Sequence, residues 1–354
     1  MQPSVNYKRV VVKIGSSILS RASRLDGASL ENLASQVWRL LDNGVEVILV
    51  SSGAVSSGMG ALNFSLRPKA ISELQACASI GQGLLMQSYI NVFLNKGRHC
   101  GQLLLTWDDF NDRRRYLNAK NTILSLLKFK SVPVINENDT VSTEEIKFGD
   151  NDNLSALVAM LVKADLLIIL SDIDGLLDNN GVKVSVVSKV TSEVKKWACP
   201  TKKEICRGGM ITKIEAAEKV NNSGISCIIA NGRTTDVLSR LVIDRENLGT
   251  VFLPASERLA CKKSWLAYSA KAKGKIIVDD GAKEALAKKN KSLLSVGVVK
   301  VEGKFKKGDI VSIIDSEQKE FGRGSVNCSS DELNLIKGRK HPREIIHRDN
   351  LVII

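Results

Sequence analysis

The chain has 354 residues and a formal net charge of +13, with 44% hydrophobic and 25% charged side chains. This length allows about two domains with buried cores, and the composition is that of an ordinary globular protein. The N-terminus has no basic stretch followed by a long apolar segment, and the longest apolar runs, such as 166–170, have the length of β-strands. Neither a signal peptide nor a membrane span is therefore predicted.

The positive charge is unevenly distributed along the chain. Residues 261–354 carry 20 basic and 12 acidic side chains, an excess of eight. Such an excess can attract nucleic acid, but it equally fits a solvated surface or an affinity for anionic metabolites. The seven cysteines are odd in number and form no Cys-x-x-Cys pair, which favours reduced thiols over a disulfide or zinc framework.

The first predicted element is a β-branched strand over 8–14, which ends in the small residues of 15–17. Lys13 lies at its end. A lone lysine there is usually a surface residue, but beside a Gly-Ser turn at the carboxyl end of a buried strand it can face a phosphate. A second strand over 45–50 runs into a loop of small residues that contains Ser52, where a ligand can approach the backbone. A plain strand-to-helix connection is the alternative for this loop.

The segment 134–158 is the most polar interruption between apolar runs in the chain. A short strand over 132–135 is followed by the polar cluster 136–139, and Gly-Asp-Asn-Asp-Asn at 149–153 precedes an apolar helical run. A helix beginning here offers unpaired N–H groups and a partial positive charge to an anionic ligand. Helix capping by Asp152 or its neighbours is the simpler alternative.

Helices and strands alternate through the first 250 residues. This pattern predicts a largely parallel sheet covered by helices on both faces. In such sheets the ligand binds beyond the carboxyl ends of the strands. The polar residues expected there are Lys13, Ser52, the cluster 136–139 and Asp172.

The segment 207–213, Arg-Gly-Gly-Met-Ile-Thr-Lys, leads into a predicted helix. Glycines before a helix start, with Lys213 in the first turn, favour a phosphate cradle, although this spacing alone is weak evidence. The chain contains neither G-x-x-x-x-G-K-[ST] nor G-x-G-x-x-G, so neither a P-loop NTPase nor a Rossmann dehydrogenase is supported.

The pattern of predicted elements changes after Pro254. A short polar and basic stretch, 255–264, is followed by short predicted strands separated by glycine-containing turns, which indicates a small, mostly-β domain, a compact barrel. The few aromatic residues of this part are not interleaved with basic ones. They are therefore interpreted as core residues rather than as a base-stacking platform.

The side chains available for chemistry favour phosphoryl transfer. Histidines occur only at 99, 341 and 347 and form no cluster with the cysteines, so no metal-ligand set is predicted and histidine-driven catalysis is disfavoured. Two glycine-associated lysines, several Asp and Asn residues at strand ends and a helix start fit the positioning and charge neutralisation of phosphoryl transfer, with a divalent ion on the nucleotide. An acceptor carboxylate is already ionised at neutral pH and needs no general base.

Six segments in chain order, VVKIGSSIL, VSSGAVSSG, VPVINENDTV, IKFGDNDNLSALVA, LSDIDGL and GGMITK, resemble the amino acid kinase superfamily and, within it, the glutamate 5-kinase family. The β-rich tail resembles a PUA domain, a module otherwise known from RNA-modifying proteins. The resemblance covers essentially the whole chain. It implies an α/β fold, an αβα sandwich around a mostly parallel sheet, followed by a PUA-like barrel. The domains would be 1–256 for the kinase, 257–264 for a linker and 265–354 for the PUA-like part.

The resemblance implies ATP-dependent phosphorylation of the side-chain carboxylate of L-glutamate to L-glutamyl 5-phosphate, the first step of proline biosynthesis, with Mg²⁺ carried by the nucleotide. It also implies a cytoplasmic homo-oligomer, a dimer or tetramer, with feedback inhibition by proline and no membrane partner. RNA binding by the tail stays open. The alternatives are a related kinase acting on aspartate, acetylglutamate or a nucleoside monophosphate, and a non-enzymatic RNA-binding protein built around the tail.

Residue roles follow from the same motifs. Lys13 and Lys213 would neutralise the moving phosphoryl group, and Asp152 would orient both lysines. The glutamate-binding residues would be Ser52, Asp139 and Asn151. The ATP-binding residues would be Lys13, Ser171, Asp172, Arg207, Gly208, Gly209, Met210, Ile211, Thr212 and Lys213. The chain departs from the family pattern at Leu177, where an aromatic residue is usual, and at Cys206-Arg207, where Gly-Thr is usual, and both departures bear on nucleotide binding.

Overall fold

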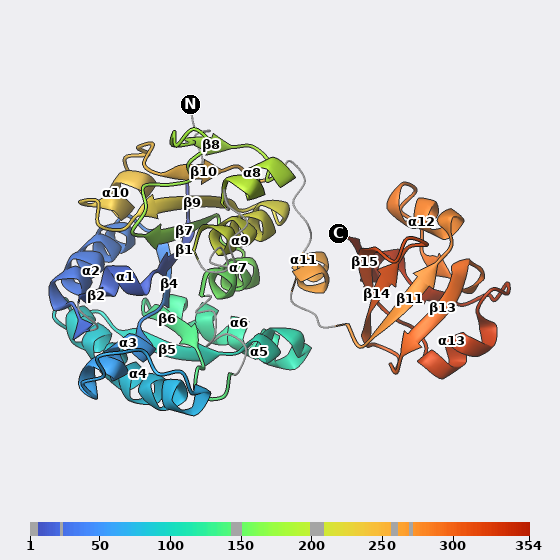
Figure 1. Ribbon diagram of the computed structural model, residues 1–354, viewed down its shortest axis with the longest axis horizontal. Helices are drawn as coiled ribbons and strands as arrows, with labels where there is room; N and C mark the ends of the chain where they lie inside the picture. The colour runs from blue at the N-terminus through green and yellow to red at the C-terminus, as the bar shows by residue number, and fades with distance from the viewer. Residues whose placement is uncertain (1–5, 22–23, 143–150, 199–208, 256–260, 269–271) are drawn as a thin grey trace. The chain divides into compact units, whose positions relative to one another are not determined.

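The computed structural model describes residues 6–21, 24–142, 151–198, 209–255, 261–268 and 272–354. The chain divides into two compact units, Met1–Asp109 with Arg113–Arg258, and Phe110–Asp112 with Leu259–Ile354 (Figure 1). Helix α11 (Cys261–Tyr268) begins within the predicted linker 257–264. The domain limits at 256 and 265 stay a prediction.

The first unit is built on one eight-stranded sheet, in the order β5-β6-β4-β1-β7-β9-β10-β8. Neighbouring strands run parallel throughout, except that β10 is antiparallel to β9. The strands are β1 (Arg9–Ile14), β4 (Glu46–Ser51), β5 (Cys100–Leu105), β6 (Val132–Glu137), β7 (Leu166–Ser171), β8 (Val186–Val187), β9 (Ser226–Asn231) and β10 (Thr250–Phe252). A separate two-stranded ribbon joins β2 (Ser20–Arg21) to β3 (Arg24–Leu25).

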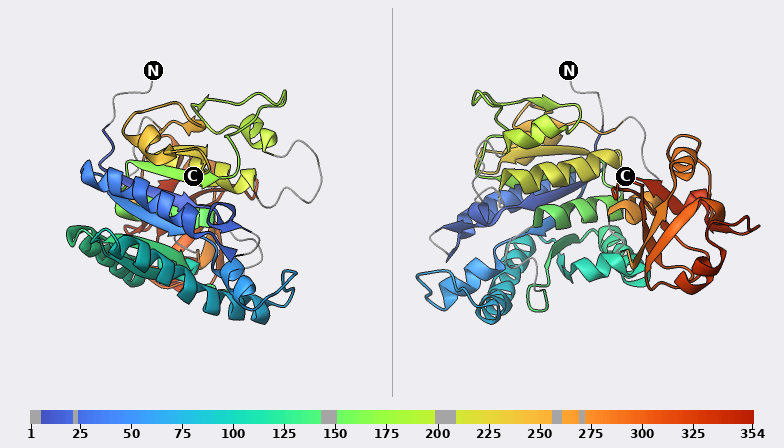
Figure 2. Two further views of the ribbon diagram at one scale, coloured as in Figure 1. Left: turned by 90° about the vertical axis from the view of Figure 1, so that its left-hand side faces the viewer. Right: turned by 45° about the vertical axis from the view of Figure 1, so that its right-hand side comes forward.

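Helices cover both faces of this sheet (Figures 1 and 2). One face packs against α1 (Ser16–Leu19), α2 (Gly27–Asp42), α4 (Ile71–Leu94) and α10 (Val237–Val242). The other packs against α6 (Arg113–Lys128), α7 (Asn151–Val162) and α9 (Met210–Asn222). Shorter helices are α3 (Ala54–Ala61), α5 (Trp107–Asn111) and α8 (Ser192–Trp197). The predicted αβα sandwich around a mostly parallel sheet is confirmed.

The alternation of side chains along β1 explains where Lys13 points. Successive side chains of a strand face opposite sides of the sheet. Val12 and Ile14 belong to the hydrophobic core shared with α2 and α4. Lys13 therefore faces the opposite layer, where α7 packs on β1. Nearly every residue of α7 is buried, which suits the apolar run predicted as a helix after Asn153.

The second unit contains a five-stranded sheet in the order β13-β11-β14-β15-β17, and a two-stranded pair of β12 with β16. The strands are β11 (Gly274–Val278), β12 (Leu293–Leu294), β13 (Val298–Gly303), β14 (Ile310–Ile314), β15 (Glu320–Ser325), β16 (Glu344–Ile346) and β17 (Leu351–Ile353). Its helices are α11, α12 (Asp280–Ala287) and α13 (Ser330–Ile336), with 3₁₀ turns at Ser295–Gly297 and Arg348–Asn350. Phe305 and Phe321 lie in its hydrophobic core, as predicted for these aromatics.

No helix in the described parts of the chain is both long and apolar enough to cross a membrane.

Candidate active site

A cavity of about 290 Å³ opens at the carboxyl ends of β1, β4, β6 and β7 in the first unit. Its walls come from the turn after β1, the loop after β4, the polar residues after β6, and the first turns of α7 and α9. Parallel strands bring their carboxyl ends to one edge of the sheet, so segments far apart in sequence meet there. Three sets of polar side chains line this cavity.

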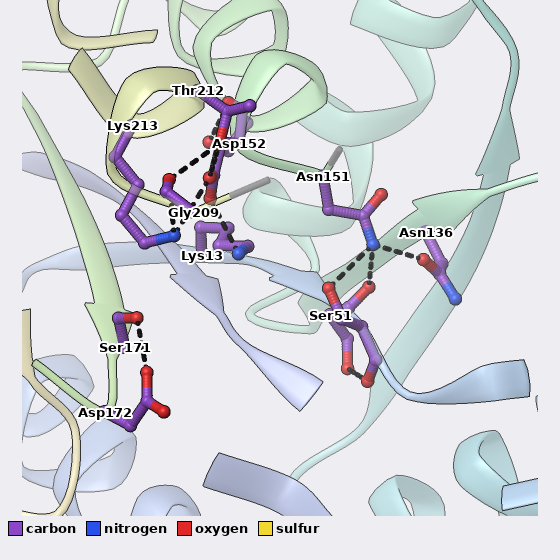
Figure 3. A network of polar contacts seen from close by, with 12 residues as sticks. Lys13, Ser51, Asn136, Asn151, Asp152, Ser171, Asp172, Gly209, Thr212 and Lys213 are labelled. Carbon is purple, nitrogen blue, oxygen red and sulfur yellow. Dashed lines mark hydrogen bonds and ion pairs between the residues drawn. The ribbon is translucent and has the colours of Figure 1, made fainter. Parts of the chain in front are cut away.

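The first set is an ionic triad of Lys13, Asp152 and Lys213 (Figure 3). Lys13 Nζ lies 2.6 Å from Asp152 Oδ1, and Lys213 Nζ lies 3.3 Å from Asp152 Oδ2. The three residues are only 6%, 3% and 7% exposed, in that order. Thr212 Oγ1 also donates a hydrogen bond of 2.7 Å to Asp152 Oδ2. One carboxylate thus joins β1 to α9 and holds two ammonium groups at the cavity wall.

The charge of Asp152 is maintained by this environment. Burial alone would raise the pKa of the Asp152 carboxyl, but the positive charges of Lys13 and Lys213 and the hydrogen bonds from Lys13 and Thr212 hold the pKa below its usual value of 3.8. The carboxylate therefore stays ionised at neutral pH. A buried ionised group of this kind, at a cavity between strand ends, is typical of a functional site.

Gly209 begins the turn that leads into α9. Its φ of 126° is in the region that side-chain-bearing residues rarely adopt. Its carbonyl oxygen accepts hydrogen bonds from Thr212 Oγ1 at 3.0 Å and from Lys213 Nζ at 3.2 Å. The N–H groups in the first turn of a helix point away from the helix body, so the start of α9 can bind an anionic group next to the triad.

The second set is a cluster of neutral amides and hydroxyls around Asn151, the first residue of α7 (Figure 3). Asn151 Nδ2 donates to Ser51 O, Ser52 Oγ and Asn136 Oδ1, each at 2.9 Å. Asn136 Oδ1 also accepts from the backbone N–H of Glu137 at 2.9 Å. Ser51 Oγ is hydrogen-bonded to the buried Tyr89 hydroxyl at 2.9 Å. These contacts fix the ends of β4 and β6 against the start of α7.

The third set lies on the remaining walls. Asp139, in the turn after β6, lines the cavity. Ser171 is the last residue of β7 and Asp172 follows it, and Ser171 Oγ donates to Asp172 Oδ1 at 3.1 Å. The cavity is therefore lined by an ionic triad, by a cluster of neutral amides and hydroxyls, and by the further carboxylates of Asp139 and Asp172.

Two family models match the chain. The amino acid kinase family model matches residues 8–231, and the PUA domain model matches residues 274–348. The chain belongs to the amino acid kinase family.

Relatives named glutamate 5-kinase align with nearly the whole length of this chain. A glutamate 5-kinase of Thermoanaerobacter pseudethanolicus is 46% identical over 364 residues, which cover 98% of both chains. A glutamate 5-kinase of Syntrophotalea carbinolica is 45% identical over 363 residues, which cover 98% of this chain and 97% of the relative. Among solved structures, the UMP kinase of Bacillus anthracis aligns with 72% of this chain at 15% identity and a TM-score of 0.48.

The amino acid kinase domain brings most of the predicted site residues to one cavity. Those that line it are Lys13, Ser52, Asp139, Asn151, Asp152, Ser171, Asp172, Gly209, Thr212 and Lys213. Met210 and Ile211 lie in the first turn of α9, half-buried and outside this lining. Arg207 and Gly208 lie outside the described residues.

The prediction from sequence did not single out Arg67 or Glu137, which also line the cavity of this amino acid kinase. Glu137 lies within the polar cluster 136–139, so the sequence predicted its place near the ligand but gave it no role of its own. Arg67 lies in the exposed loop after α3, where no strand end or helix start draws attention to it. Only the folded arrangement identifies it.

The loop after β4 is held by a close approach of two helices. A Cβ on Gly58 of α3 would lie 1.8 Å from Cys77 O, and one on Gly81 of α4 would lie 1.8 Å from Ala54 O. Only glycine allows backbones to approach this closely. Since Ala54 lines the cavity, the packing of α3 on α4 sets the position of the cavity wall that includes Ser52.

Proposed function

We propose that this amino acid kinase transfers the γ-phosphate of ATP to the side-chain carboxylate of L-glutamate, giving ADP and L-glutamyl 5-phosphate, the first step of proline biosynthesis. The relatives called glutamate 5-kinase, at 45% and 46% identity over nearly the whole chain, support this substrate assignment. The observation that carries the reaction type is the buried triad of Lys13, Asp152 and Lys213 at the cavity wall.

In the proposed reaction an oxygen of the glutamate carboxylate forms a bond to the γ-phosphorus. The bond from that phosphorus to the bridging oxygen breaks, and ADP leaves with the electron pair. The acceptor carboxylate is ionised at neutral pH, so no proton has to be removed. Lys13 and Lys213 would neutralise the charge on the transferred group, and Asp152 would hold both ammonium groups aimed at it.

The substrates would be held by different walls of the cavity. Ser52, Asp139 and Asn151 would bind glutamate, with the Asp139 carboxylate suited to its ammonium group. Ser171, Asp172 and the segment 207–213 would bind ATP, with the start of α9 facing its phosphates. The lining of one cavity by Ser52, Asp139, Asn151, Ser171, Asp172, Gly209, Thr212 and Lys213 supports these assignments.

Mg²⁺ would enter with the nucleotide and supply positive charge between its phosphates. The hard carboxylate oxygens of Asp172, on the cavity wall beside Ser171, are donors of the kind that Mg²⁺ prefers. Asp172 would therefore help to hold the ion at the ATP side of the cavity.

Trapping the acyl phosphate with hydroxylamine tests the proposed function directly. Incubation with ATP, Mg²⁺ and L-glutamate is expected to give γ-glutamyl hydroxamate. Aspartate, acetylglutamate and a nucleoside monophosphate serve as competing acceptors, with phosphorylation of the nucleotide followed by ADP release. Turnover of one of these acceptors with no γ-glutamyl hydroxamate from glutamate would show that the substrate assignment is wrong.

Further properties of the proposed enzyme are inhibition by proline, assembly into a homo-oligomer and a cytoplasmic location. The hydroxamate assay with added proline tests the first, and light scattering of the purified protein tests the second. RNA binding by the PUA domain, residues 274–348, is a separate question, because ATP turnover neither requires nor excludes it. Strongly salt-dependent binding of RNA by the full-length chain would support it.

A further inference from the structure

Gln82 of α4 does not line the cavity, but it is hydrogen-bonded to Asn136 of the amide cluster. Asn136 Nδ2 donates a hydrogen bond of 2.7 Å to Gln82 Oε1. Asn136 is 2% exposed, so its amide has little access to water and its orientation depends on protein contacts.

The contacts of Asn136 leave one orientation of its amide. Its Oδ1 accepts from the backbone N–H of Glu137 and from Asn151 Nδ2, both at 2.9 Å. Turning the amide over would place its NH₂ group against these two donors and its oxygen against Gln82 Oε1. The acceptor at Gln82 therefore stabilises the orientation in which Asn136 presents an oxygen to Asn151.

Asn151 in turn has all its donor capacity used inside the protein. Its single NH₂ group faces three acceptors, Ser51 O, Ser52 Oγ and Asn136 Oδ1. In Figure 3 all three dashed lines meet at its nitrogen, and its oxygen is turned away from them. Among the described residues no hydrogen bond to Asn151 Oδ1 is recorded, and Asn151 lines the cavity. The group that Asn151 offers to a ligand is thus an acceptor.

We infer that Gln82 is a positioning residue that acts through Asn136 to hold Asn151 Oδ1 toward the ammonium group of the amino-acid substrate. The inference rests on the proposed function, because it takes an acceptor substrate with an ammonium group. An amide oxygen recognises a hydrogen-bond donor, so Asn151 selects for the amino group and not for either carboxylate. The relay Gln82–Asn136–Asn151 makes that selection by fixing which end of the last amide faces the ligand.

The packing of α4 fits this role. Gly81, the residue before Gln82, brings α4 within contact distance of the backbone at Ala54 and Gly58. The backbone that carries Gln82 is therefore fixed against α3 and cannot shift to follow a change in the amide cluster. Gln82 itself is only half-buried, so its side chain can be replaced without opening the core.

Substitution of Gln82 tests the relay with two ligands that differ by the ammonium group. Gln82→Leu removes the acceptor, and Gln82→Met does the same with a side chain of closer shape. Both are expected to raise the KM for L-glutamate about tenfold, since a hydrogen bond to a charged group is weakened, with little change in kcat. The inhibition constant of glutarate, which lacks the ammonium group, is expected to stay within about twofold. Gln82→Glu keeps an oxygen acceptor toward Asn136 and is expected to retain the wild-type KM.

Gln87→Leu is the matched control, because it makes the same change on the exposed side of α4, where Gln87 bonds to Asn91 in its own helix. It is expected to change neither constant. An unchanged KM for glutamate in both Gln82→Leu and Gln82→Met, or an equal weakening of glutamate and glutarate, would overturn the relay. Failure of the proposed function has a different result, since the wild-type protein would then give no γ-glutamyl hydroxamate at all.

Discussion

Two neighbouring residues at the start of α7 serve opposite halves of the cavity. Asp152 joins a charged half, in which two lysines contact one buried carboxylate at 2.6 and 3.3 Å. Asn151 joins a neutral half, in which amides and hydroxyls contact one another at 2.9 Å. Adjacent residues in the first turn of a helix point in different directions, which lets one helix start serve both halves.

The two halves differ in the free-energy cost of removing one contact. A buried ion whose partner is removed is left uncompensated, which costs several kcal/mol. A neutral hydrogen bond between buried groups is worth about 1 kcal/mol, and its loss mainly loosens geometry. The charged half should therefore control turnover and stability steeply, whereas the neutral half should control the affinity for the acceptor by smaller steps.

The charged half is tested most directly by Lys213→Ala. Removing one of the two ammonium groups proposed to stabilise the transferred phosphoryl group is expected to lower kcat about a thousandfold, with a change of only a few-fold in the KM for glutamate. Lys195→Ala is the control, because Lys195 of α8 forms a partly exposed ion pair with Glu218, which lies on α9 as Lys213 does. It is expected to leave kcat unchanged. Comparable losses in kcat and in glutamate affinity for Lys213→Ala would argue against the assigned role of Lys213.

Asp152→Asn separates the electrostatic role of the triad from its shape. The variant leaves two buried ammonium groups without their carboxylate and is expected to lower the free energy of unfolding by about 3 kcal/mol near pH 7. Urea denaturation monitored by circular dichroism measures this difference.

The pH dependence of that difference has a defined sign. Because the folded-state pKa of Asp152 lies below its usual value of 3.8, the ionised carboxylate stabilises the fold above that value, and the contribution is lost as the pH falls through the folded-state pKa. The gap between wild type and Asp152→Asn should therefore narrow in acid, where both side chains are neutral. A gap that stays constant from about pH 7 to about pH 3 would show that charge is not its origin.

Gly81→Ala tests whether the neutral half depends on the approach of α4 to α3. The added Cβ would lie 1.8 Å from Ala54 O and 2.3 Å from Gly58 N, so the helices must separate. Overpacking of this kind is expected to cost about 2 kcal/mol of stability and to raise the KM for glutamate. Gly83→Ala makes the same change two residues later, where nothing lies within 4 Å, and should instead stabilise α4 by up to about 1 kcal/mol. If Gly81→Ala and Gly83→Ala changed the stability and the KM for glutamate equally, the cavity would not depend on the contact of α4 with α3.

Each member of the charged half lies at a place that the local sequence marks, whereas the joining of the three residues in one ionic group was implied by the resemblance to the amino acid kinase superfamily. Lys13 ends a β-branched strand, Asp152 stands before an apolar helical run, and Lys213 follows a Gly-Gly pair in the first turn of α9. The strand edge of a parallel sheet then brings these places together. The main strands were predictable for the same reason, since buried parallel strands are continuous apolar runs.

The support for the neutral half could not be predicted in this way. Gln82 and Tyr89 lie on α4, whose sequence is apolar around most of its circumference, and a polar residue on such a helix does not reveal which residue it will contact. The bond from Asn136 to Gln82 spans 54 positions, and the bond from Ser51 to Tyr89 spans 38. Likewise, α12 and α13 of the PUA unit are short helices between strands, where turns and helices have similar local patterns.

The smallest effect is expected from Tyr89→Phe, which acts at the outer limit of the neutral half. Burial raises the pKa of Tyr89 far above its usual range, so its hydroxyl is neutral near pH 7 and shares a hydrogen bond of 2.9 Å with Ser51 Oγ. Its removal leaves Ser51 Oγ with a longer bond of 3.3 Å to Ser52 O, so the loss should be about 1 kcal/mol, a rise of a few-fold in the KM for glutamate and an unchanged kcat. Ser88→Ala, which removes a hydroxyl bonded to Leu84 O within α4, is the control. A loss of kcat in Tyr89→Phe like that expected for Lys213→Ala would show that the two halves of the cavity are coupled. Turnover and acceptor affinity would then not be controlled by separate halves, even at a residue as far from the triad contacts as Tyr89.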